Sequence, residues 1–162
     1  IVSDDLFDRM KANDILAFSQ PIFVASDKKI IASLVGEEAA QRSYLWKTML
    51  KKGLICCGGS DAPVERFDVL ENIQVAVTRD ALHEKTEGWH PQEKLSVLEA
   101  LRMFTISNAY ASFDEQNKGS LEIGKAADLV LLSNDPFTTD AHSIAQIQVL
   151  KTYVDGKEVY SV

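Results

Sequence analysis

A lone carboxylate, Asp61, stands in the stretch GGSDAP at residues 58–63, directly after the apolar run LICC at residues 54–57. An uninterrupted apolar run is typical of a parallel strand that is covered on both faces. In α/β folds, the residues that follow the carboxyl ends of parallel strands form the ligand-binding face. Asp61 is therefore a candidate metal ligand or proton shuttle. The alternative that it caps the turn or begins a helix stays open.

Two other kinds of chemistry are weaker hypotheses for the same stretch. Gly58 and Gly59 would let the main chain approach a ligand closely. Neither glycine motif of phosphate-binding loops is present, however, and the carboxylate would repel a phosphate. Ser60 lacks the G-x-S-x-G turn that exposes a nucleophilic serine.

The three histidines do not form a recognisable metal-ligand set. His83, His90 and His142 fall outside the H-x-H and H-x-x-x-H spacings of histidine metal sites. We expect each of them to be a loop or surface residue. For His90, which follows Trp89, two interpretations stay open: it lines a substrate pocket, or it packs in a turn.

Composition excludes several classes of protein. The 162 residues, 46% hydrophobic and 25% charged, predict a globular chain with one substantial core. With 17 basic and 24 acidic residues the net charge is -7, which disfavours binding to nucleic acid. No apolar run approaches the roughly 20 residues that span a membrane, so we predict no membrane partner and a cytoplasmic location. Because the sequence begins at Ile1 rather than Met, we expect a longer parent protein.

The two cysteines, Cys56 and Cys57, are neighbours in the predicted strand. Adjacent strand residues point to opposite faces, so the two thiols cannot form an ordinary disulfide. We expect both to be small core residues rather than redox groups.

Periodicity predicts an α/β region in the first part of the chain. The expected elements are a helix after the capping segment 3–5, a strand at 15–18, a long connection to Gly36, one helix over 37–52 and the strand at 54–57. The two strands, together with the connection and the helix between them, would form a strand-helix-strand unit. The buried stripe of the helix over 37–52 would hold Leu45, Trp46, Met49 and Leu50.

The second part predicts helices and then a small β region. The expected elements are a helix over 68–77, a helix that begins at a capping box of Ser96 and Glu99, a short helix over 105–112, a turn-rich stretch at 119–125, a strand at 128–132 and a hairpin around Asp155-Gly156. Asp-Gly between two apolar runs is the strongest short-range hairpin signal.

The end of the chain resembles the C-terminal signature of the amidohydrolase superfamily. The residues that carry this resemblance are Thr105, Asn108, Ala109, the stretch GSLE at 119–122 and the stretch GKAADLV at 124–130. More narrowly, the chain resembles the YtcJ-like branch, also called amidohydrolase 3, in Gln20-Pro21, Asp27, Gly36, Arg42, Tyr44, Trp46, Gly53, the stretch GSDAPV at 59–64, Thr78-Arg79 and Trp89-His90-Pro91. The resemblance covers essentially the whole chain.

The resemblance implies an α/β fold that is the C-terminal part of a (β/α)8 TIM-like barrel followed by part of a small β-sandwich. Residues 1–120 would hold the last part of the barrel, with strand seven at 15–19 and strand eight at 54–57, and residues 121–162 would hold strands of the sandwich. The superfamily's metal ligands include an early H-x-H, a middle Lys or Glu, two further histidines and a last Asp after strand eight. Of these, the chain matches only the last, with Asp61.

The implied function is metal-dependent hydrolysis of C–N bonds in amides, formamides or cyclic amides, with zinc or another divalent metal as cofactor. Asp61 would be both the metal ligand and the catalytic proton shuttle, and Glu65, Arg79 and Trp89 would contact a small amide-like substrate. Because one carboxylate does not make a ligand set, we expect the chain alone to be inactive and to hold no metal tightly.

A hypothesis from another class of function stays open beside the enzyme hypothesis. The chain would then be a non-catalytic, self-associating fragment or a binding module, which the missing histidines favour. Two parallel strands taken from a closed barrel would leave unpaired edges, so we expect a homo-oligomer. A small complete protein that binds a ligand at its open strand ends is the weakest alternative, because Ile1 is not a natural start.

Overall fold

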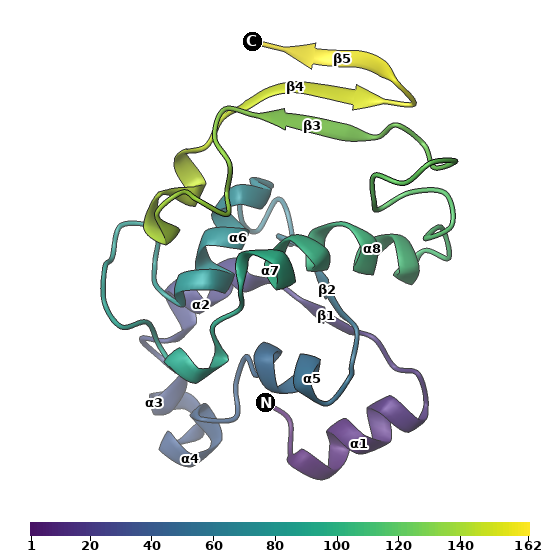
Figure 1. Ribbon diagram of the computed structural model, residues 1–162. Helices are drawn as coiled ribbons and strands as arrows, with labels where there is room; N and C mark the ends of the chain where they lie inside the picture. The colour runs from purple at the N-terminus through teal and green to yellow at the C-terminus, as the bar shows by residue number, and fades with distance from the viewer.

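The computed structural model describes residues 1–162 and contains two separate sheets joined by helices (Figure 1). A parallel pair, β1 (Ala17–Ser19) and β2 (Cys56–Gly58), lies in the helical part. An antiparallel sheet of β3 (Leu129–Leu132), β4 (Val149–Val154) and β5 (Lys157–Ser161) forms the opposite end of the molecule (Figure 1). The chain therefore has the predicted α/β class and the predicted order of an α/β region before a β region.

The parallel pair confirms the strand-helix-strand unit. Ala17 pairs with Cys56, and the ladder continues to Ser19 and Gly58. Each strand is shorter than the apolar run that predicted it, and both end beside the glycines at 58 and 59. The carboxyl ends of β1 and β2 therefore lie side by side, as they must in a parallel pair.

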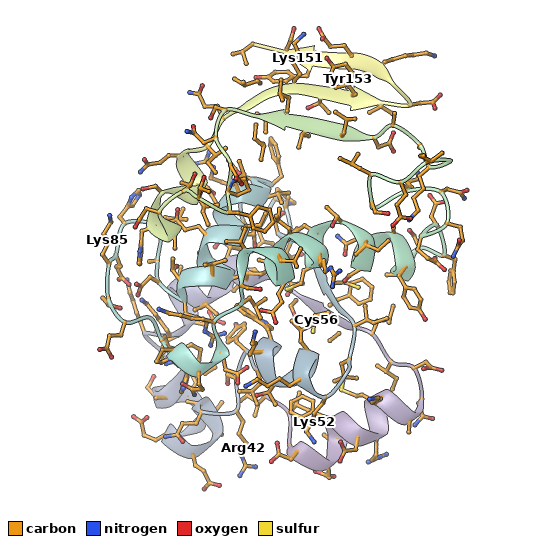
Figure 2. All side chains as sticks on the ribbon, viewed as in Figure 1. Arg42, Lys52, Cys56, Lys85, Lys151 and Tyr153 are labelled. Atoms are coloured by element: carbon orange, nitrogen blue, oxygen red, sulfur yellow. The ribbon has the colours of Figure 1, made fainter.

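Helix α1 (Asp4–Ala12) lies where the sequence predicts it and buries Phe7 completely. Its first turn carries Asp4 and Asp5 and its last turn Arg9 and Lys11, which complements the helix dipole. An ion pair of 3.0 Å between Asp8 of this helix and Lys52, which is labelled in Figure 2, joins α1 to the segment just before β2.

The segment between β1 and β2 differs from the prediction. Instead of a long connection and one helix, it forms η1 (Pro21–Phe23), α2 (Val24–Asp27), α3 (Ile31–Val35), α4 (Glu37–Ala40) and α5 (Trp46–Lys51). The single helix over 37–52 is wrong because Tyr44 has a φ of 57°, which no α-helix accommodates. The Tyr44 hydroxyl donates a hydrogen bond to the Asp27 carboxylate of α2 and so fixes this break. The predicted stripe survives, since Trp46 and Met49 are buried.

Helix α6 (Val69–Thr78) connects the two parts of the molecule. Asp68 caps it, accepting a hydrogen bond of 2.9 Å from the Leu70 amide. Buried polar side chains of α6 reach neighbouring segments: Asn72 accepts from the Ile22 amide of η1 at 3.1 Å. Gln74 accepts from the Ala145 amide of η3 (Ala141–Gln146) at 2.9 Å. The segment that leads into β4 is thereby docked on α6.

The next helices follow the predicted signals. Ser96 and Glu99 form the expected capping box at the start of α7 (Val97–Phe104), and α8 (Ile106–Ala111) follows directly. Between α6 and α7 lies the single turn η2 (Pro91–Glu93). An ion pair of 2.5 Å between Lys47 and Glu99 joins α5 to α7.

The C-terminal sheet confirms the hairpin prediction. Asp155 and Gly156 both have positive φ, 49° and 72°, as the type I′ turn requires. Lys151 of β4, labelled in Figure 2 together with Tyr153 of the same strand, forms an ion pair of 2.6 Å with Glu158 of β5. Every residue of β5 is exposed, so this sheet has an uncovered outer edge.

A buried charge, Asp80, secures the loop after α6. The Thr86 amide and hydroxyl donate to its carboxylate at 2.9 and 2.6 Å, and Lys28 and His142 lie 3.5 and 3.2 Å from it. Burial alone would raise the pKa of Asp80, but the bonds from Thr86 and His142 and the charge of Lys28 outweigh it and lower the pKa to about 2. The carboxylate is thus ionised and joins three segments of the chain.

No helix in the structure has the length and apolar composition needed to cross a membrane.

We predict different costs for replacing the two glycines after Cys57. In Gly58→Ala the added carbon would stand 2.7 Å from the ring of Phe104, so the free energy of unfolding should fall by about 1–3 kcal/mol. Gly59→Ala is the matched control, because nothing lies within 4 Å of the corresponding position. It should change stability by less than about 0.5 kcal/mol. Urea unfolding followed by circular dichroism measures both. Equal losses would contradict a role for the Phe104 contact.

Candidate active site at the end of strand β2

Asp61 lies in the turn that follows β2, exposed and with a φ of 58°. The turn is closed by main-chain atoms, because the Val64 amide donates to the Asp61 carbonyl at 2.8 Å. The following helix is capped by the side chain of Asp68 instead. The alternative that Asp61 begins a helix is therefore wrong, and the turn that it would cap is closed by its main-chain carbonyl rather than by its carboxylate.

The strand end before Asp61 is held from two sides. Toward β1, the Gly59 amide donates to the Ser19 carbonyl at 3.0 Å. Toward α8, the Asn108 side-chain amide donates to the Gly58 carbonyl at 2.9 Å, and the Cys57 thiol donates to the Ser107 carbonyl at 3.4 Å. The point from which the Asp61 turn departs is thus fixed by both a neighbouring strand and a helix.

An open cleft of about 320 Å³ lies at these strand ends. Its lining comes from the ends of β1 and β2 and from α8, and consists of Phe18, Ser19, Gln20, Gly58, Gly59, Asn108, Ala111 and Ser112. Most of these groups are polar or main-chain groups that can bind a polar small molecule. The cleft stops two residues before Asp61, so the carboxylate stands beside it rather than in its wall.

A second cleft of about 510 Å³ is more apolar and faces the start of β2. It lies between α5 and the α7–α8 pair, and is lined by Leu50, Leu54, Ile55, Glu99, Arg102, Met103, Ile106, Ser107 and Tyr110. Because ligand sites of parallel sheets lie at the carboxyl ends of the strands, we place the candidate active site at the first cleft.

Both cysteines are buried core residues, as the sequence predicts. Cys56 lies in the middle of the molecule, where α5 and α7 both contact β2 (Figure 2). Burial raises the pKa of Cys56 to about 12 and also raises the pKa of Cys57. Both thiols are therefore protonated at neutral pH and unsuited to nucleophilic or metal-binding roles.

The structure brings only one of the predicted substrate contacts near Asp61. Glu65 is half-buried in the same turn. Arg79 and Trp89 instead follow the far end of α6, a ten-residue helix about 15 Å long. Within this chain, neither Arg79 nor Trp89 lines the cleft.

Arg79 and Trp89 belong to a buried aromatic cluster. The Arg79 guanidinium lies 4.6 Å from the ring centre of Trp46 and 5.2 Å from that of Trp89, and is wholly buried. It donates to the carbonyls of Tyr44 at 2.8 Å and Trp89 at 2.9 Å, while its Nη2 atom has no partner. Burial lowers the pKa of Arg79 to about 10, against the opposing effect of Glu93. These contacts join Tyr44 to the loop at Trp89, and a contact of Arg79 or Trp89 with substrate stays a prediction.

The histidines stay apart, as the sequence predicts. His142 meets Asp80, and the ring of His90 lies 4.0 Å from that of Trp89, edge to face. Of the two interpretations of His90, the structure therefore supports packing in a turn. No three His, Cys, Asp or Glu side chains come close enough together to hold a metal ion. Asp61 fits a metal as a single free carboxylate ligand, and the other ligands would have to come from outside these 162 residues.

The profile of the amidohydrolase family matches residues 1–160, almost the entire chain. The chain belongs to the amidohydrolase family. It is 35% identical to the protein YtcJ of Bacillus subtilis over 99% of its own length and 30% of YtcJ. It is 36% identical to the N-substituted formamide deformylase of Arthrobacter pascens, over 68% of this chain and 20% of that protein.

Solved structures agree with this assignment. An uncharacterized metal-dependent hydrolase of Pyrococcus furiosus is 31% identical and superposes with a TM-score of 0.73, over 85% of this chain and 27% of that one. The chain thus spans less than a third of the length of each of these three proteins.

Two features of this site were missed by sequence reasoning. The first is the bond from Asn108 to Gly58, which joins residues 50 positions apart. The second is the ring of Phe104 against Gly58. Asn108 was part of the family resemblance, which gave it no role. The only local signal was a glycine at the end of an apolar strand, which indicates close approach by some group without naming it.

We predict that Arg79 affects stability rather than ligand affinity. Arg79→Met should lower the free energy of unfolding by about 2–4 kcal/mol, because two carbonyls lose their donor in a buried place. Arg42→Met is the matched control: Arg42 is exposed at the outer end of the molecule (Figure 2), and its ion pair with Glu38 should contribute under about 0.5 kcal/mol. Urea unfolding compares the two. Unchanged stability with weakened substrate binding would contradict this prediction and support the substrate contact.

Proposed function

We propose that the chain is the C-terminal part of a metal-dependent amidohydrolase that hydrolyses C–N bonds other than peptide bonds, in amides, formamides or cyclic amides. The observation that carries this proposal is the free carboxylate of Asp61 just beyond the end of β2, in a chain of the amidohydrolase family. The similarity to a formamide deformylase favours small amide-like substrates.

In this proposal residues 1–120 form the last part of a (β/α)8 barrel, with β1 as strand seven and β2 as strand eight. Residues 121–162, which contain β3, β4 and β5, form strands of a small β-sandwich. The parallel pairing of β1 with β2 and the antiparallel sheet after residue 120 support this division.

Asp61 has two roles in the proposed reaction. It is one ligand of zinc or another divalent metal, which when bound lowers the pKa of its water to about 7 and polarises the scissile carbonyl. The Asp61 carboxylate takes a proton from the attacking water as the oxygen bonds to the carbonyl carbon. It then gives that proton to the leaving nitrogen as the C–N bond breaks.

The other residues of the chain bind and orient. Glu65, in the same turn, is the proposed contact for a polar group of the substrate. The cleft beside the turn offers the hydroxyl of Ser19 and the side-chain amide of Gln20. Because Asp61 is a single ligand, the 162-residue chain alone should be inactive, with catalysis belonging to the complete ligand set.

Replacing Asp61 tests the catalytic assignment. In the full-length enzyme, Asp61→Asn should lower kcat by about 10²- to 10⁴-fold, because the amide cannot accept the proton of the attacking water. Folding should be retained, since no bond in the turn uses the carboxylate and Asn tolerates a positive φ. Turnover of N-substituted formamides and N-acyl amino acids, with metal analysis of the same samples, measures the effect.

The control is Asp68→Asn, a change of the same kind seven positions further on. Asn caps helices as well as Asp does, so this variant should keep both activity and stability. Near-complete turnover in Asp61→Asn, or a loss equal to that of Asp68→Asn, would contradict the catalytic role.

A second candidate function, a non-catalytic self-associating module, is favoured by one observation. Phe18 in the middle of β1 is 68% exposed, and β1 has only one neighbouring strand. An apolar, unpaired strand edge promotes pairing with another chain. In the enzyme proposal the rest of the barrel covers this edge, whereas in the alternative a second copy does.

We expect the 162-residue chain on its own to form a dimer or larger species. Phe18→Lys should shift it toward monomer, since a charge on an edge strand blocks pairing. Phe113→Lys is the control, because Phe113 is 95% exposed but lies outside both strands, and it should leave the association unchanged. Light scattering at high micromolar concentration measures the mass. A strictly monomeric wild-type chain would contradict self-association.

A further inference from the structure

We infer that Asn108 is a positioning residue for Asp61: its side-chain amide sets the place of the strand end from which the Asp61 turn departs. The inference rests on the proposed function of Asp61 and extends it to a residue of another element, α8. It is carried by the bond of 2.9 Å from Asn108 to the Gly58 carbonyl.

The direction of this bond explains its effect. Residues 55, 57 and 59 of the β2 segment face β1, since Ala17 bonds to the Ile55 carbonyl and the Gly59 amide bonds to Ser19. In a parallel ladder the alternate residues direct their main-chain groups to the opposite edge. The Gly58 carbonyl therefore points away from β1, and Asn108 is its hydrogen-bond partner there.

Two further contacts make this joint rigid. The Phe104 ring occupies the place where a side chain of residue 58 would be, at 2.7 Å from the position of a Cβ atom. The Cys57 thiol donates to the Ser107 carbonyl at 3.4 Å. Consecutive residues of β2 are thus held by the α7–α8 pair, and within these 162 residues Asn108 is the hydrogen-bond partner of the Gly58 carbonyl.

The turn itself offers little to fix Asp61. Its carbonyl is bonded to the Val64 amide, but the side chain is exposed and the residue has a positive φ. A catalytic carboxylate must stay within about 0.5 Å of its productive place. That precision has to come from the residues before the turn, and Asn108 is the side chain that holds them.

The test uses the full-length enzyme with Asn108→Ala and Asp61→Asn, singly and together. Asn108→Ala should lower kcat about 10- to 100-fold with KM changed less than about threefold, as expected of a displaced catalytic group. Amide hydrogen exchange of the peptide spanning residues 57–62 should become faster, without a general increase. In the Asp61→Asn background, Asn108→Ala should cost no further activity, because its effect passes through the carboxylate.

Asn117→Ala is the matched control. Asn117, in the turn after α8, also donates a side-chain bond, of 2.8 Å, but to Asp114 rather than to the strand. It should leave kcat and the exchange of residues 57–62 unchanged. If Asn108→Ala does not fold, Asn108→Ser keeps a shorter donor and should give a smaller loss of the same pattern.

The outcomes separate the two claims. Unchanged kcat in Asn108→Ala, or losses that multiply in the double variant, would overturn the positioning role while the Asp61 assignment stands. If Asp61→Asn is itself fully active, the proposed function fails, and the exchange of residues 57–62 still decides whether Asn108 holds the strand end.

Discussion

The close approach of Phe104 to Gly58 is the constraint on which the site depends. With the ring carbons 2.7 Å from where a Cβ would stand, any side chain at residue 58 would force the Phe104 ring of α7 to shift. That packing lets Asn108 reach the Gly58 carbonyl, and it forms one side of the cleft at the strand ends. Since β1 holds the other side through Ser19, the chain direction after Gly59 is set before the turn begins. A glycine here is therefore a packing requirement rather than a source of flexibility.

The second constraint on the fold lies in helix α6, which has buried polar side chains with hydrogen-bond partners inside the protein. Asn72, Gln74 and Thr78 each use a side chain for hydrogen bonds within the protein, to η1, to η3 and within the helix. A buried polar group without a partner costs about 1–3 kcal/mol, so these bonds allow only one docking of the neighbouring segments. Asp80 continues the pattern with Thr86 and His142. The attachment of the β region to the helical region is thus specified by directional bonds as well as by apolar contact.

Sequence patterns predicted the elements whose causes are local. The capping box of Ser96 and Glu99, the Asp-Gly turn and the apolar run before Gly58 each depend on a few adjacent residues, and each is present. The helix break at Tyr44 was missed because its cause is a bond to Asp27 in another helix. Arg79 was expected to contact substrate because of the family resemblance, and its burial between Trp46 and Trp89 arises from tertiary packing that no local sequence pattern shows. For the site, the sequence predicts Asp61, which stays a proposal, and the contacts that hold its strand end span 50 positions and leave no periodic signal.

The conformation of Asp61 bears on why an aspartate occupies this place. At a φ of 58° most residues are strained, whereas Asp and Asn adopt the left-handed region at low cost. The turn alone would accept Asn or Gly equally well, so its geometry does not require a carboxylate. Nor does the helix that follows, since Asp68 supplies the cap. A carboxylate that local structure can use in neither way, placed beyond a rigidly held strand end, is instead available for a partner outside this chain. The proposed catalytic role of Asp61 would account for a carboxylate at a place where the local fold uses none.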